Sequence, residues 1–325
     1  MKLFILMLFT IPLFQACAPA KPTQITSNNS IFHANAEEML NDFIPHLQEE
    51  HAVPAVGVGL IENGRIKYIK VFGEHQNGMR APDDTIFNVA SIAKPVVTMA
   101  VLKLVQSGEW DLDEPLFHHW TDPDIKDHPY LQLLTSRHVL THSTGFRNWR
   151  RHFENGRLNF DFKPGTGYQY SGEGMEYLRR AIEAKFDIPF NELMTSLVFK
   201  PANMNNSTLE WLSPDKLKKF SHWYDGDGNK HQINYETPRA NAADDLLTTI
   251  EDLSNFSIAV MEQQLVSGNV YRDMMRPQVA VNNRLSRGLG WVVLPNLAEG
   301  EIALNHDGGD PGVSTAMTLF PNSKS

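Results

Sequence analysis

A serine and a lysine stand three residues apart at the head of an apolar segment. Ser91 and Lys94 begin this segment, and Pro95 follows the lysine directly. On a helix, residues three apart share a face with Cβ atoms about 5–6 Å apart, so the amine can reach the hydroxyl. A serine needs a nearby base to become a good nucleophile, and a lysine can serve when burial or positive neighbours lower its pKa. The pair therefore predicts an activated serine.

Pro95 indicates where the helix begins. Proline is tolerated near a helix start, where few backbone hydrogen bonds are lost, so we expect the helix to begin near Ser91. The unpaired N–H groups of a first turn can also hold an oxyanion. The S-x-x-K spacing alone is weak evidence, because a surface serine and lysine often share it by chance.

Two later segments supply further candidate groups. Residues 164–178 read PGTGYQYSGEGMEYL, so that Tyr170 closes a glycine-rich turn before an expected helix. Residues 305–314 read NHDGGDPGVS and close a β-rich run at His306. A tyrosinate near a cation can accept a serine proton. A strand without side-chain bulk lets a substrate lie along its edge. The alternatives are a packed tyrosine and a surface histidine.

Together these motifs resemble those of the serine β-lactamase and penicillin-binding-protein-like superfamily, on its class C and esterase side. Its first motif corresponds to Ser91-x-x-Lys94, its second (usually Y-x-N) to Tyr170-Ser171-Gly172, and its third (K-T-G or H-x-G) to His306-Asp307-Gly308. Residues 87–116, 138–146, 242–256 and 288–291 also agree with the family, and the likeness extends from residue 36 to the end of the chain.

The resemblance implies a role for each matched residue. Ser91 would be the acylated nucleophile, and Lys94 would tune and shuttle its proton. Tyr170 would be the general base in acylation and would activate water in deacylation. The remaining implied groups are the oxyanion-hole N–H groups of Ser91 and Gly309, and the substrate-binding residues Gly172, His306, Asp307 and Gly308. No metal or cofactor is implied, and the expected partner is a small-molecule or peptide substrate.

Two departures from the family pattern bear on the substrate. Gly172 stands where the family has an asparagine that binds the acyl amide, and His306 stands where many β-lactamases have a lysine. A histidine is mostly neutral near pH 7. These changes favour an esterase, a D-amino-acid peptidase or an amidase over a dedicated β-lactamase. Arg287 or Arg147 could replace the missing positive charge.

Hydrophobic periodicity predicts an α/β (α+β) fold, in which an antiparallel sheet flanked by helices carries a large, mostly helical insertion. We expect a helix over 36–50 and a hairpin of strands turning at Asn63-Gly64. Helical patterns dominate from 91 to about 200. The α/β part would span about 36–90 and 246–325, and the helical part about 91–245, with a cleft between them. The expected strands are 54–61, 66–72, 288–295, 301–309 and 313–321.

The two ends of the chain carry separate expectations. Lys2, an apolar run over 3–14 and the lone Cys17 resemble a lipoprotein signal peptide over 1–17, followed by a linker over 18–35. The expected location is the periplasm or cell envelope, with Cys17 lipidated as the only membrane anchor; a plain secretory signal is the alternative. At the other end, the family leads us to expect two more strands and a helix, so the C-terminus looks shortened.

Composition excludes some functions. The net charge is −9 over 325 residues and no basic stripe is present, which argues against nucleic-acid binding. Asp225, Asp227 and Asn229 alternate as in a calcium loop, but Lys230 stands where that loop needs glycine, so a polar turn is favoured. A serine hydrolase is the leading hypothesis. The alternative is a non-catalytic envelope protein that uses the same fold to bind peptidoglycan fragments or a protein partner.

Overall fold

The structure is a computed structural model that describes residues 36–76, 78–231, 240–282 and 285–325. The first described element is α1 (Ala36–His51), which packs against the hairpin of β1 (Ala55–Glu62) and β2 (Arg65–Gln76). The hairpin turns at Asn63 and Gly64, both with positive φ, as the Asn-Gly sequence predicts. The short strand β3 (Met79–Arg80) pairs with β2.

The late strands form a second sheet of five strands in the order β10-β9-β8-β7-β6. Every pairing in it is antiparallel. The strands are β6 (Val279–Ala280), β7 (Ser286–Arg287), β8 (Val292–Leu294), β9 (Ala303–Asp310) and β10 (Val313–Leu319). This mixed architecture of antiparallel sheets and helices confirms the predicted fold class.

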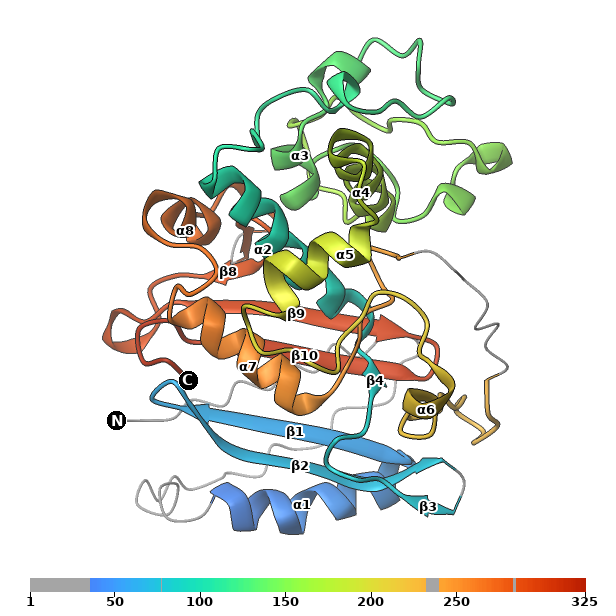
Figure 1. The fold of residues 1–325 in the computed structure, drawn as a ribbon, viewed down its shortest axis with the longest axis vertical. Coiled ribbons are helices and arrows are strands. Elements are labelled where there is room, and N and C mark those ends of the chain that lie inside the picture. The colour runs from blue at the N-terminus through green and yellow to red at the C-terminus, as the bar shows by residue number, and fades with distance from the viewer. Residues whose placement is uncertain (1–35, 77, 232–239, 283–284) are drawn as a thin grey trace, which may run out of the picture.

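The predicted single sheet is nevertheless divided. In Figure 1, β9 and β10 run above the β1–β2 hairpin, but β1 and β10 are not hydrogen-bonded neighbours among the described strands. The Gly64 N–H donates to the Lys324 carbonyl oxygen (2.8 Å) across this boundary. A third, two-stranded sheet pairs β4 (Phe87–Asn88) with β5 (Leu247–Thr248), which ties the chain just before Ser91 to the end of the helical part.

The helices between the sheets are separated by long irregular stretches. They are α2 (Ala93–Gln106), α3 (Ser136–Leu140), α4 (Gly172–Phe186), α5 (Phe190–Met194), α6 (Pro214–Leu217), α7 (Ile250–Met261) and α8 (Gly268–Met275). Only short 3₁₀ turns interrupt 107–135 and 141–171. The helical pattern expected from 91 to 200 is therefore less continuous than predicted.

Helix α2 lies at the centre of the molecule and is buried on nearly all sides. One continuous core runs from Val89 through α2 and α4 to Leu319 on β10. Helix α7 lies against β1, where a Cβ at Gly57 would come within 2.5 Å of the Ile250 side chain. This close approach explains why β1 has a glycine at position 57. It also lets α7 pack directly against the hairpin.

Some sequence expectations need correction. The strand expected over 288–295 is confined to Val292–Leu294, because 288–291 form a turn in which the Gly288 N–H donates to the Trp291 carbonyl (3.0 Å). Strands β9 and β10 match their predicted spans within two residues. Cys17, the signal segment and the linker lie outside the described residues. No helix in the described part of the chain is long and apolar enough to span a bilayer.

Candidate active site

Ser91 lies in a 3₁₀ turn over Ala90–Ile92 that leads directly into α2. Lys94 Nζ is 2.9 Å from Ser91 Oγ, and it also donates to the Ala243 carbonyl oxygen at 2.7 Å. The lysine side chain is 1% exposed, whereas Ser91 is half-buried. The arrangement therefore places a desolvated amine beneath a hydroxyl that a ligand can reach.

Tyr170 enters the same site from the residues before α4. Ser171 caps this helix by accepting the Gly174 N–H (2.9 Å), which fixes the turn that carries the tyrosine. The Tyr170 hydroxyl is hydrogen-bonded to Ser91, and Lys94 Nζ lies 4.8 Å from the centre of the phenol ring. A phenol, an amine and a hydroxyl from separate stretches thus meet around Ser91.

Burial controls how these groups ionise. Desolvation and the charge of Arg287 lower the pKa of Lys94, Asp244 and Asp310 oppose the change, and the net value is about 7. Burial raises the pKa of Tyr170 well above 10, against the lowering effects of its hydrogen bond to Ser91 and of Arg287. Near neutral pH the tyrosine is therefore a neutral phenol, and the lysine is unprotonated in a substantial fraction of molecules.

Strand β9 supplies the third predicted motif. Alternation along the strand places His306 and Gly308 on its buried face and Asp307 on its exposed face. A Cβ at Gly308 would lie 2.6 Å from the Val89 carbonyl oxygen and 3.1 Å from the Ser91 amide nitrogen. Glycine therefore keeps space open beside the Ser91 N–H, the first of the two predicted oxyanion donors. Gly309, which carries the second, is exposed and open.

His306 is buried and uncharged. Its Nδ1 is 2.8 Å from the Asp307 carbonyl oxygen, its Nε2 has no partner within the described structure, and burial holds its pKa well below 6.5. It therefore does not replace the lysine cation. Arg287 does lie at the site: it is 7% exposed, and its guanidinium carbon is 5.6 Å from the centre of the Tyr170 ring. Arg147 instead pairs with Asp161 (2.9 Å).

Two parts of the site have no clear signal in the sequence. Asp244, shortly before β5, and Asp310, at the end of β9, are hydrogen-bonded to each other. The charge of each carboxylate raises the pKa of Lys94. Burial, and then repulsion by Asp310, raise the pKa of Asp244 to about 7, so this carboxyl group carries a proton in about half of the molecules at neutral pH. Asp244 falls in a segment that matches the family, but nothing local shows that it meets Asp310.

His142 is the second part of the site that the sequence did not single out. Its ring centroid lies 4.3 Å from that of Tyr170, and its Nδ1 accepts the Ser171 N–H at 3.2 Å. Its carbonyl oxygen accepts the Gln169 N–H at 2.8 Å. Histidine thus holds the Tyr170 turn through both its backbone and its side chain. Burial keeps the pKa of His142 well below 6.5, so the ring is a neutral acceptor.

The other sequence candidates form no site. In the turn at 224–230, Asp225 accepts the N–H groups of Asp227 and Asn229, which makes a closed polar turn; the rest of the suspected calcium loop lies outside the described residues. Elsewhere in the helical part, the adjacent His118 and His119 both contact Glu114. Among the residues that the structure describes, no three His, Cys, Asp or Glu side chains could hold a metal ion.

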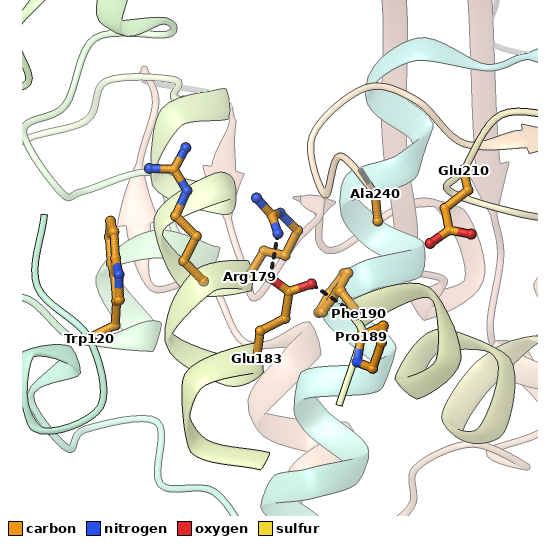
Figure 2. Close-up of a pocket in the computed structure, with 8 residues that line it drawn as sticks. Trp120, Arg179, Glu183, Pro189, Phe190, Glu210 and Ala240 are labelled. Carbon is orange, nitrogen blue, oxygen red and sulfur yellow. Dashed lines mark hydrogen bonds and ion pairs between the residues drawn. The ribbon is translucent and has the colours of Figure 1, made fainter. Parts of the chain in front are cut away.

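A hollow of about 620 Å³ lies beside α4 (Figure 2). It is lined by Trp120, Arg179, Arg180, Glu183, Pro189, Phe190, Glu210 and Ala240. Arg179 in its wall is already paired with Glu183, as the dashed line in Figure 2 shows. The hollow contains none of the groups around Ser91, so its size does not make it the reactive site.

Comparison with known proteins agrees with this geometry. The Beta-lactamase family matches residues 40–325, and the chain belongs to that family. It is 25% identical to penicillin-binding protein 4* of Bacillus subtilis over 88% of this chain and 69% of that protein. It is 28% identical to esterase EstB of Burkholderia gladioli over 53% of this chain and half of EstB. A solved class C β-lactamase superposes with a TM-score of 0.76 at 18% identity, covering 90% of this chain and 91% of that one.

Proposed function

We propose that the protein is a serine hydrolase that forms an acyl-enzyme at Ser91 and acts on carboxylic esters. The observation that carries the proposal is the 2.9 Å contact between Ser91 Oγ and the buried Lys94 Nζ, beside the Tyr170 hydroxyl. The match to an esterase and to penicillin-binding proteins supports the same class of chemistry.

The pKa directions favour Lys94 as the proton acceptor. In its neutral form Lys94 takes the proton of Ser91 across their hydrogen bond while Ser91 Oγ attacks the ester carbonyl carbon. The C–O bond to the leaving group then breaks, and Lys94 returns the proton to the leaving alkoxide by way of the Tyr170 hydroxyl. The family resemblance implies a base role for Tyr170, but its raised pKa instead favours a phenol that relays protons.

Deacylation uses the same groups. A water molecule attacks the acyl carbon while its proton passes to Lys94 through Tyr170. Lys94 then returns that proton to Ser91 Oγ as the acyl C–O bond breaks, which frees the serine hydroxyl and releases the carboxylic acid. The Ser91 N–H, with the space that Gly308 keeps beside it, stabilises the oxyanion in both steps. Arg287 stabilises the developing negative charge on the Tyr170 oxygen during transfer.

The choice of ester over β-lactam rests on the charges at the site. His306 supplies no cation, and the carboxyl groups of Asp244 and Asp310 disfavour an anionic substrate near Lys94. Arg287 is the nearby cation, but it is buried, with its guanidinium against the rings of Tyr168 and Tyr170. A neutral ester therefore suits the site better than the carboxylate of a penicillin.

A fluorophosphonate probe tests the proposal directly. Wild type should gain the mass of one phosphonyl group on Ser91 and should release a burst of nitrophenol from p-nitrophenyl acetate. Ser91→Ala should lose the label and at least a thousandfold in turnover while keeping its melting temperature. An unlabelled wild type with no burst would refute the hydrolase and leave a non-catalytic binding protein as the explanation. Nitrocefin under the same conditions separates a lactamase from an esterase.

We propose that the signal over 1–17 exports the chain and that Cys17 anchors it in the cell envelope, where peptidoglycan fragments are within reach. Palmitate labelling of the expressed full chain, compared with Cys17→Ala, tests the anchor. Equal labelling of the two would contradict it.

A further inference from the structure

Residues 147–151 form a strap that is fixed to the start of α4. Asn148 accepts the Gly172 N–H through its side chain and the Glu173 N–H through its carbonyl oxygen, both at 2.8 Å. The Arg150 N–H donates to the Glu173 carboxylate at 3.0 Å. Trp149 stands between these two anchored residues, so its backbone has little freedom to move.

The Trp149 ring lies directly on Gly172. A Cβ added at Gly172 would come within 2.8 Å of Trp149 Cη2 and within 3.1 Å of two more atoms of the same ring. Three contacts with one planar group cannot be relieved by moving a flexible side-chain end. The volume that any side chain at 172 would need is therefore already filled by the indole.

Trp149 also belongs to the surroundings of the reactive groups. Gly172 follows Tyr170 by two residues, so the indole covers the chain next to the phenol. The Arg151 guanidinium carbon lies 5.4 Å from the Trp149 ring centre, and the charge of Arg151 acts on Asp310 at the end of β9. The half-buried indole thus lies against the residue that follows the Tyr170 turn, beside a cation whose charge acts on Asp310.

We propose that Trp149 determines substrate specificity by replacing a polar side chain at position 172 with an apolar aromatic surface. The preferred substrates are then esters of apolar acids with an acyl chain long enough to lie on the indole. Substrates whose acyl amide needs a hydrogen-bonding side chain at this place are disfavoured. This inference rests on the proposed function and names its substrate class.

The experiment compares p-nitrophenyl hexanoate with p-nitrophenyl acetate as a ratio of kcat/KM values. Wild type should prefer the hexanoate, and Trp149→Ala should lower that ratio about tenfold, the scale of losing one apolar contact in a pocket. The loss of kcat/KM should be larger on the hexanoate than on the acetate, because the acetyl group does not reach the ring. Trp149→Phe should keep most of the preference. Phe43→Ala, an exposed change on α1, is the control and should leave the ratio unchanged.

A second comparison tests whether positions 149 and 172 share one volume. Gly172→Asn alone should lower the melting temperature and the activity, whereas Gly172→Asn with Trp149→Ala should recover both. Additive effects of the two substitutions on melting temperature would refute the shared volume without any activity assay. A labelled Ser91 combined with an unchanged acyl ratio in Trp149→Ala would refute the specificity role alone. An unlabelled Ser91 would remove the proposed function and this inference with it.

Discussion

The pH dependence of acylation should follow the ionisation of Lys94. Burial lowers the pKa of this lysine from 10.5 to about 7, so the neutral amine forms as the pH rises through 7. Because only the neutral amine accepts the Ser91 proton, kcat/KM for p-nitrophenyl acetate should rise with pH and reach a plateau above about pH 8.

The magnitude follows from the same pKa. At pH 7 about half of the molecules carry the neutral amine, whereas a solvated lysine with a pKa of about 10.4 would be neutral in roughly one molecule in 2,500. Below pH 7 the neutral fraction, and with it kcat/KM, should fall about tenfold for each pH unit. Burial of Lys94 therefore increases the fraction of neutral amine at pH 7 about a thousandfold.

Two substitutions should shift the rising part of the pH profile of kcat/KM, here called the limb, in opposite directions. Arg287 lowers the pKa of Lys94, so Arg287→Gln should shift the limb to higher pH. Asp244 raises that pKa, so Asp244→Asn should shift the limb to lower pH. Each shift should be about one pH unit, the size of a single charge acting across a partly buried site. Arg147→Gln removes a cation paired with Asp161 and should leave the profile unchanged.

The assay is a set of initial rates between pH 5.5 and 9 with burst kinetics at the ends of the range. A flat wild-type profile, or shifts of equal sign in Arg287→Gln and Asp244→Asn, would refute the role of Lys94. If the rise with pH disappears completely in Asp244→Asn, it would instead be assigned to the carboxyl pair, in which the pKa of Asp244 also lies near 7.

Two further substitutions test the frame around Ser91. Gly308→Ala places a Cβ 2.6 Å from the Val89 carbonyl oxygen, which should cost about 1–3 kcal/mol of stability. Crowding the Ser91 N–H should also lower kcat about a hundredfold, which melting curves and rates check; wild-type kcat would show that this space is not needed. His142→Asn tolerates the positive φ of 54° but removes the ring from Tyr170, so kcat should fall about tenfold with KM nearly unchanged. A proportional rise in KM would point to substrate binding rather than to positioning of the phenol.

Local features of the fold followed from the sequence because they depend on neighbours along the chain. The turn at Asn63-Gly64 and the helix start near Ser91 each involve residues within four positions of one another. The lengths of β9 and β10 followed from apolar alternation. The strand expected over 288–295 failed because Gly288 and Gly290 form a turn there, a choice made by contacts with Met274 and Leu140.

The sequence alone determined which residue types could react and in what order they occur, because spacing and residue chemistry are properties of a linear chain. Only the tertiary structure decided their ionisation and surroundings. Burial of Lys94 sets its pKa, and Asp244 meets Asp310 across 66 residues of chain. The Trp149 ring takes the space over Gly172. Desolvation and excluded volume depend on everything packed around a group, and most of those neighbours lie far away in the sequence.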